Sequence, residues 1–154
     1  MALTRRQVLW GIAALPVAGW AISSRRADAG AGKVYSEGGI AVDGSDVVAY
    51  FTDGVPTKGR TDLTHDWMGV TWRFASEENR DVFAADPTAY APQYGGFCAY
   101  AVSKGYTAST VPEAWKIVDG KLYLNFSRRI QRKWERDVAG NIAAGDANWP
   151  TLVG

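Results

Sequence analysis

Two side chains of this sequence stand out as able to do chemistry, because each is the only one of its kind: His65 and Cys98. An imidazole and a thiolate are both ligands of transition metals, and a copper site is less demanding than a zinc site, which commonly takes four ligands. A cysteine activated by a histidine is also a catalytic nucleophile. A third interpretation is a non-catalytic interaction or scaffold domain in which both side chains are buried.

A β-hairpin is predicted around His65. Residues 63–67 and 70–74 flank Met68-Gly69, a turn whose glycine can adopt a positive φ. The register pairs three residues of one strand with three of the other: Trp67 with Val70, His65 with Trp72, and Leu63 with Phe74. Because these six side chains share a face, His65 is expected to point inward from an apolar row. Met68, a further soft donor, falls in the turn and is the weaker candidate ligand.

The elements after the hairpin are predicted to position Cys98. Ser76 is a natural N-cap for a helix that runs to about Ala85. After an extended connector and a sharp bend, residues 97–104 are expected to form a short helix that stops at Gly105. Cys98 would then lie in its first turn, where free backbone amides favour a thiolate.

The remaining chain predicts an α+β fold. Residues 40–42 and 47–51 are predicted to form a short strand pair or one bulged strand. Asp119-Gly120 is the strongest hairpin signal, between strands 115–118 and 121–124. Ser127 can cap a final helix that Gly140 breaks, and its outer face is basic. We expect a small single domain with two β-hairpins packed against short helices and a C-terminal helix.

The N-terminal segment has the pattern of an export signal. Arg5-Arg6 precede an apolar run over residues 9–22, and small residues allow cleavage before Gly30. We therefore predict a twin-arginine signal peptide over residues 1–29, a linker over 30–37, a domain over 38–150 and a periplasmic or other extracytoplasmic location. An ordinary secretory signal and an uncleaved anchor are the alternatives. The run is too short for a confident bilayer span, so no stable membrane span is expected after signal removal.

Composition narrows the classes of partner. The 154 residues carry a net charge of +1, and removal of the signal takes four arginines and one aspartate, which leaves about −2. This balance argues against nucleic-acid binding. One cysteine cannot form an intramolecular disulfide, so the core must hold without one. No paired-carboxylate, phosphate-loop or Ser-His-Asp pattern is present, and we assign no catalytic residue.

Two runs of residues are recognisable as motifs: His65-x-Trp67-x-Gly69-x-x-Trp72-x-Phe74-x-Ser76 and Tyr94-Gly-Gly-Phe-Cys98-Ala. They resemble the YHS-domain family, and in particular its exported, stand-alone bacterial branch with a twin-arginine signal. The resemblance extends over residues 38–149. It implies a small α+β domain that binds metal and occurs beside heavy-metal and copper transport machinery.

The chain departs from the family at two positions. The metal-associated members of the family that this chain resembles share the motif Phe-Cys-Ser-x-x-Cys. This chain has Ala75 and Asn79 in place of the two cysteines. The ligands that remain are Cys98 and His65. The resemblance therefore implies a soft-metal site, copper before zinc, formed by this pair, with a metal-transport or metalloprotein partner. The sequence leaves the oligomeric state and any delivery partner open.

Overall fold

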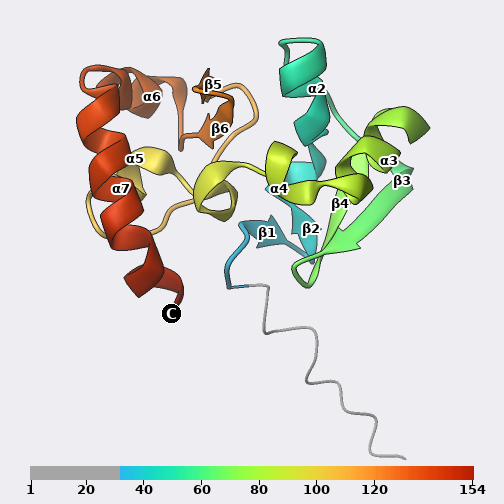
Figure 1. The fold of residues 1–154 in the computed structure, drawn as a ribbon, viewed down its shortest axis with the longest axis horizontal. Helices are drawn as coiled ribbons and strands as arrows, with labels where there is room; N and C mark the ends of the chain where they lie inside the picture. The colour runs from blue at the N-terminus through green and yellow to red at the C-terminus, as the bar shows by residue number, and fades with distance from the viewer. Residues whose placement is uncertain (1–31) are drawn as a thin grey trace, which may run out of the picture.

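A four-stranded sheet forms around the hairpin that carries His65 (Figure 1). The computed structural model describes residues 32–154. In spatial order the strands are β1 (Ser36–Glu37), β2 (Ile40–Ala41), β4 (Val70–Phe74) and β3 (Arg60–Trp67). β2 and β4 are parallel, whereas the other two pairs are antiparallel. His65 therefore lies on an edge strand.

The predicted hairpin is confirmed except at its open end. Trp67 lies opposite Val70 and His65 opposite Trp72, and both residues of the Met68-Gly69 turn have positive φ. Leu63 was expected opposite Phe74, but Arg60 takes that place because the register shifts between Arg60 and Thr64. This register shift is a β-bulge, and it does not change the face of the sheet toward which the Leu63 side chain points, since Leu63 and Phe74 are both buried.

The predicted strand over residues 47–51 is wrong: these residues belong to helix α2 (Val47–Thr52). The β-branched run favours a strand locally, but Asp46 caps a helix there. Its buried carboxylate accepts hydrogen bonds from the amides of Val48 and Ala49 at 3.0 and 3.2 Å. The second oxygen accepts from the Ala75 amide and from Nδ2 of Asn79, each at 2.8 Å. Asp46 thus joins α2 to the end of β4 and the start of the next helix.

Short helices follow the hairpin and lead to Cys98. They are α3 (Glu77–Ala85), α4 (Pro87–Tyr90), the 3-10 turn η3 (Gln93–Gly96) and α5 (Ala99–Ser103). Ser76 caps α3 as predicted, by accepting from the Asn79 amide at 3.1 Å. The connector over residues 90–94, expected to be extended, is so only at Ala91 and Pro92, because α4 ends at Tyr90 and η3 begins at Gln93. The helix predicted over residues 97–104 is shorter than expected, and Cys98 is its N-cap residue.

The C-terminal part contains the second hairpin and two helices. β5 (Trp115–Val118) and β6 (Lys121–Leu124) pair as predicted, and Ser127 caps α6 (Arg128–Glu135). The final helix was expected to break at Gly140, but the break comes earlier, where Asp137 caps a separate helix, α7 (Val138–Val153). Gly140 lies within α7, and its amide donates to Asp137.

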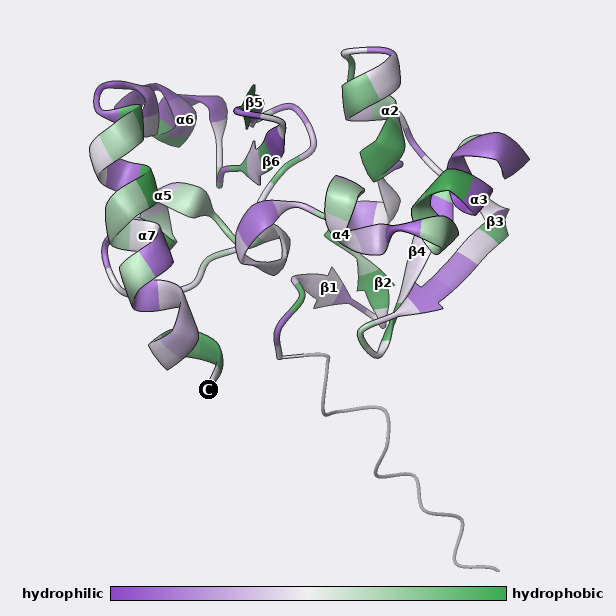
Figure 2. Cartoon of the chain, in the orientation of Figure 1, coloured by the Kyte–Doolittle hydropathy of each residue, from purple (hydrophilic) through white to green (hydrophobic). Residues whose placement is uncertain are grey.

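Two hydrophobic clusters hold these elements together. The first lies among the four-stranded sheet, α2 and α3, and the second lies among α5, α6 and α7. Leu122 and Leu124 of β6 belong to the first cluster while Tyr123, which points the other way, belongs to the second. Figure 2 shows hydrophobic colour on α2 and β2 and hydrophilic colour on the exposed β3 and α6.

A turn at Tyr94, Gly95 and Gly96 connects the two clusters. All three residues have positive φ, and a Cβ at Gly95 would collide with the Lys33 carbonyl. The Tyr94 hydroxyl donates to Asp146 of α7 at 2.9 Å. Burial first, and then Asp146, raises the pKa of Tyr94 far above its ordinary value of 10.0.

The predicted signal peptide, residues 1–29, and the first residues of the linker lie outside the described residues. No helix within residues 32–154 is long and apolar enough to cross a membrane.

We expect the free energy of unfolding to fall as pH rises above 10. Tyr94 stays protonated in the folded protein, whereas the unfolded chain loses this proton near the ordinary pKa of 10.0. Unfolding therefore releases protons at alkaline pH, and stability decreases with pH. Urea unfolding from pH 9 to 11 measures this slope. The Tyr94→Phe variant should show a shallower slope, and an unchanged slope would contradict the assignment.

The Asp46→Ala variant should lose about 2–4 kcal/mol of stability, because four donors lose their acceptor and α2 loses its cap. Denaturant unfolding monitored by tryptophan fluorescence measures the change. The matched control is Asp62→Asn, whose exposed carboxylate pairs only with Arg60. The control should leave the midpoint unchanged. Equal midpoints for wild type and Asp46→Ala would show that Asp46 is not the link described here.

Candidate functional site

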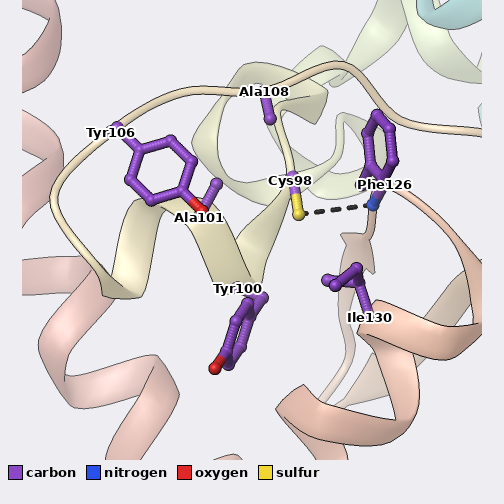
Figure 3. A pocket seen from close by; sticks show the side chains of 7 residues that line it. All are labelled: Cys98, Tyr100, Ala101, Tyr106, Ala108, Phe126 and Ile130. Carbon is purple, nitrogen blue, oxygen red and sulfur yellow. Dashed lines mark hydrogen bonds between the residues drawn. The ribbon is translucent and has the colours of Figure 1, made fainter.

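Cys98 lies at the bottom of an open pocket between α5, β6 and α6 (Figure 3). The cavity is about 220 Å³, and its lining is mainly apolar and aromatic. The residues that line it are Cys98, Tyr100, Ala101, Tyr106, Ala108, Phe126 and Ile130. Tyr106 and Phe126 are exposed at its rim, while Cys98 itself is only 1% exposed. We call this cavity the Cys98 pocket.

Local backbone contacts fix the position of the sulfur. The turn at Tyr94–Gly96 brings the chain to Cys98, whose amide donates to the Ala108 carbonyl at 2.9 Å. The Cys98 carbonyl accepts from the Val102 amide and so starts α5. The sulfur is therefore held by the helix start on one side and by the loop at Ala108 on the other.

Two polar groups contact the Cys98 sulfur. The Phe126 amide donates to Sγ at 3.3 Å, and the thiol lies 3.6 Å from Oδ1 of Asn125. The same Oδ1 accepts from the Tyr100 amide at 3.1 Å, which fixes the orientation of the buried Asn125 side chain. Its Nδ2 has no partner within the described residues. Sequence reasoning missed Asn125 and Phe126, because a polar residue just after a strand looks like an ordinary turn residue.

His65 lies in the other part of the molecule. Its ring packs edge-on against Phe83 of α3, with 6.1 Å between ring centroids. Figure 1 shows β3 at one end of the protein and α5 at the other, and no residue of β3 lines the Cys98 pocket. The structure therefore does not bring His65 and Cys98 together. Met68 lies in the β3–β4 turn beside Trp67 and Trp72, and it also lies away from Cys98.

A resident metal site does not fit this arrangement. Among residues 32–154 no three His, Cys, Asp or Glu side chains come together in a group that could hold an ion. A shared first-row metal needs donors within about 2.0–2.3 Å of the ion, so the Cys98 sulfur and the His65 ring cannot share one from opposite ends of the fold. The expected pair is therefore not a first coordination shell in this structure.

The two positions that lack the family cysteines have a structural role here. The Ala75 amide and the Asn79 side chain both donate to Asp46, as described above. A buried carboxylate with four donors needs no further partner. This end of the sheet is thus cross-linked by hydrogen bonds between side chain and backbone.

Comparison with known proteins agrees with the first of the two motifs, the one that begins at His65. The family model of the YHS domain matches residues 48–94. No curated protein and no solved structure gave a significant match. The matched segment contains α2, the β3–β4 hairpin, α3 and α4, and it ends at Tyr94, four residues before Cys98. Residues 48–94 of the chain therefore match the YHS domain.

Proposed function

We propose that this protein is a non-catalytic binding domain whose ligand surface is the Cys98 pocket. The observation that carries the proposal is the pocket itself: a concave, mainly apolar cavity with a few fixed polar groups at its base. Ligand sites commonly combine such a lining with a small number of polar groups that orient the ligand. In this proposal the Phe126 amide holds the Cys98 sulfur in place, and the sulfur orients the ligand.

The contacts of the sulfur do not favour a thiol-dependent enzyme. A nucleophilic thiol needs a base within hydrogen-bond reach, about 2.6–3.2 Å, to take its proton. The polar partners of Sγ are an asparagine oxygen and a backbone amide, and neither is a base. His65, the base expected from the sequence, packs against Phe83 instead.

A soft metal is the second candidate ligand, copper before zinc. Metal handling is associated with the YHS family, and a thiol facing an open cavity is a ligand that Cu(I) prefers. Cys98 would supply one donor, and a metal-transport or metalloprotein partner would supply the rest. In both candidates the paired arginines at residues 5 and 6 direct export by the twin-arginine route, so binding takes place outside the cytoplasm.

Filling the pocket should abolish ligand binding without unfolding the protein. Small aromatic fragments, screened by amide chemical shifts on the full chain, are expected to perturb Cys98, Ala108 and Phe126 together. The Ala108→Leu variant adds bulk to the pocket wall and should remove these shifts. Val55→Leu, a change at an exposed position, is the matched control. Chemical-shift changes that lie in other regions of the protein, and that are equal in Ala108→Leu and Val55→Leu, would contradict the proposal.

Metal titration separates the two candidate ligands. We expect Zn(II) to be lost from the full chain on desalting, because one thiol does not make a four-ligand site. If a metal is the ligand, one equivalent of Cu(I) is retained by wild type and by His65→Ala but lost from Cys98→Ser, as measured by elemental analysis. Loss of Cu(I) from both variants would restore a shared Cys98–His65 site and contradict the separation described here.

A further inference from the structure

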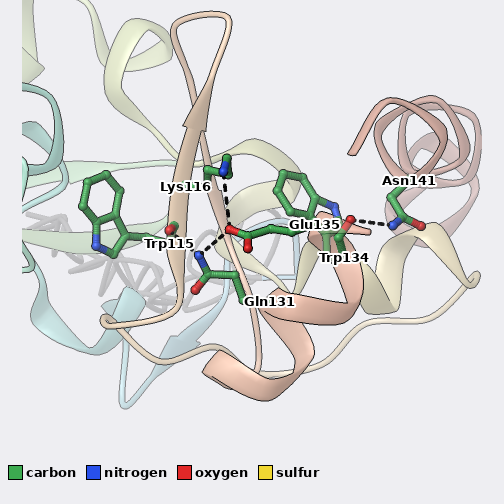
Figure 4. Close-up of polar contacts among 6 residues, drawn as sticks. All are labelled: Trp115, Lys116, Gln131, Trp134, Glu135 and Asn141. Carbon is green, nitrogen blue, oxygen red and sulfur yellow. Dashed lines mark hydrogen bonds and ion pairs between the residues drawn. The ribbon is translucent and has the colours of Figure 1, made fainter. Parts of the chain in front are cut away.

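The exposed face of α6 concentrates positive charge beside the Cys98 pocket. Its cations are Arg128, Arg129, Arg132, Lys133 and Arg136, and we call this set the α6 cation face. None of the five makes an ion pair within residues 32–154. The acid of the helix, Glu135, is already engaged by Lys116 at 3.5 Å and by Gln131 at 3.1 Å (Figure 4). Glu113 lines a cavity together with Arg128 and Arg132, and Asp137 follows Arg136 in the sequence.

This charge pattern is unfavourable for the helix itself. Arg128 and Arg129 occupy the first turn, where the helix dipole favours acids. Three like-charge pairs also stand at i, i+4 spacing: Arg128 with Arg132, Arg129 with Lys133, and Arg132 with Arg136. Each such pair destabilises a helix by roughly 0.2–0.5 kcal/mol. Arg132 and Lys133 lie in the last turn, where the helix dipole favours cations. Helix stability therefore leaves the two first-turn arginines unexplained, whereas a bound anion would offset their repulsion.

Exposed aromatic side chains adjoin the cation face. Phe126 comes just before the cap of α6 and is 52% exposed, and Tyr106 across the pocket is 54% exposed. Ile130 of α6 lines the same pocket, so the charged helix supplies one wall of the apolar cavity. Arg128 and Arg132 line a second cavity on α6, together with Glu113 and Glu135. Aromatic and arginine side chains are enriched at the centres of protein interfaces.

We infer that the Cys98 pocket and the α6 cation face together bind an acidic polypeptide segment that carries one bulky apolar side chain. This inference rests on the proposed binding function of the pocket and names the class of partner. The apolar side chain enters the pocket between Tyr106 and Phe126, and carboxylates pair with the planar guanidinium groups. Arg128 to Arg136 spans ~12 Å along the helix, the length of about four extended residues.

The geometry favours a polypeptide over a membrane surface. A helix that lies in a membrane interface buries its own apolar face among the lipids. The apolar face of α6 is turned into the protein instead, because Trp134 is fully buried in the second cluster. A pocket of about 220 Å³ accommodates a single side chain, which a polypeptide can present at a fixed distance from its carboxylates.

Selection from a random twelve-residue peptide library displayed on phage, with the full chain as bait, tests the inference. Enriched peptides should carry several acidic residues around one Phe, Leu, Ile or Trp. Their affinity should fall at least tenfold in Arg129→Glu/Lys133→Glu and in Tyr106→Ala/Phe126→Ala. The matched control, Lys58→Glu/Lys121→Glu, makes the same change in net charge at exposed positions elsewhere and should leave affinity unchanged. Affinity should also fall with added salt.

Two other outcomes separate this inference from the proposed function. If enriched peptides depend on Tyr106 and Phe126 but carry no excess of acids, the pocket binds ligands and the acidic partner is wrong. If no enriched peptide depends on the pocket residues while the aromatic fragments still perturb Cys98, Ala108 and Phe126, the inference is wrong and the proposed function stands. If the fragments fail as well, both proposals are wrong. Sedimentation with vesicles of phosphatidylcholine and 30% phosphatidylglycerol that depends on the α6 cation face, without competition from the selected peptides, would assign the face to lipid and overturn the inference.

Discussion

Three successive residues with positive φ, Tyr94, Gly95 and Gly96, are the constraint on which the rest of the arrangement depends. At Gly95 the backbone carbonyl accepts from the Tyr35 amide at 2.9 Å, which ties the turn to the start of the sheet. At Tyr94 the side chain enters the second cluster and bonds to α7. Because one turn is fixed to both clusters, it also fixes Cys98 only a few residues later.

This constraint separates the family segment from the pocket. The YHS match ends at the turn, and all seven residues that line the Cys98 pocket come after it. His65 belongs to the family segment and sits on an edge strand of the sheet, whereas Cys98 begins a helix of the other cluster. The matched segment therefore belongs to one part of the molecule, and the Cys98 pocket belongs to the other.

The features that were predictable from the sequence are those that neighbouring residues determine. The Met68-Gly69 and Asp119-Gly120 turns set two hairpins, and Ser76 and Ser127 cap two helices, since each depends on contacts within a few residues. The Val47–Thr52 helix was missed because its strongest partners, Ala75 and Asn79, are remote in sequence. The distance between His65 and Cys98 was unpredictable for the same reason, because long-range packing rather than local pattern sets it.

The hydrogen bonds of Asp46 give a physical reason for the site to lie where it does. A metal bound by cysteines can contribute directly to the stability of a small domain. In this chain the two positions that lack those cysteines donate instead to one buried carboxylate, which links α2, β4 and α3 without an ion. The Asp46 carboxylate is thereby satisfied by donors of the protein itself. The exposed aromatics Tyr106 and Phe126 and the cations of α6, on which the proposed binding surface rests, belong to the other part of the fold.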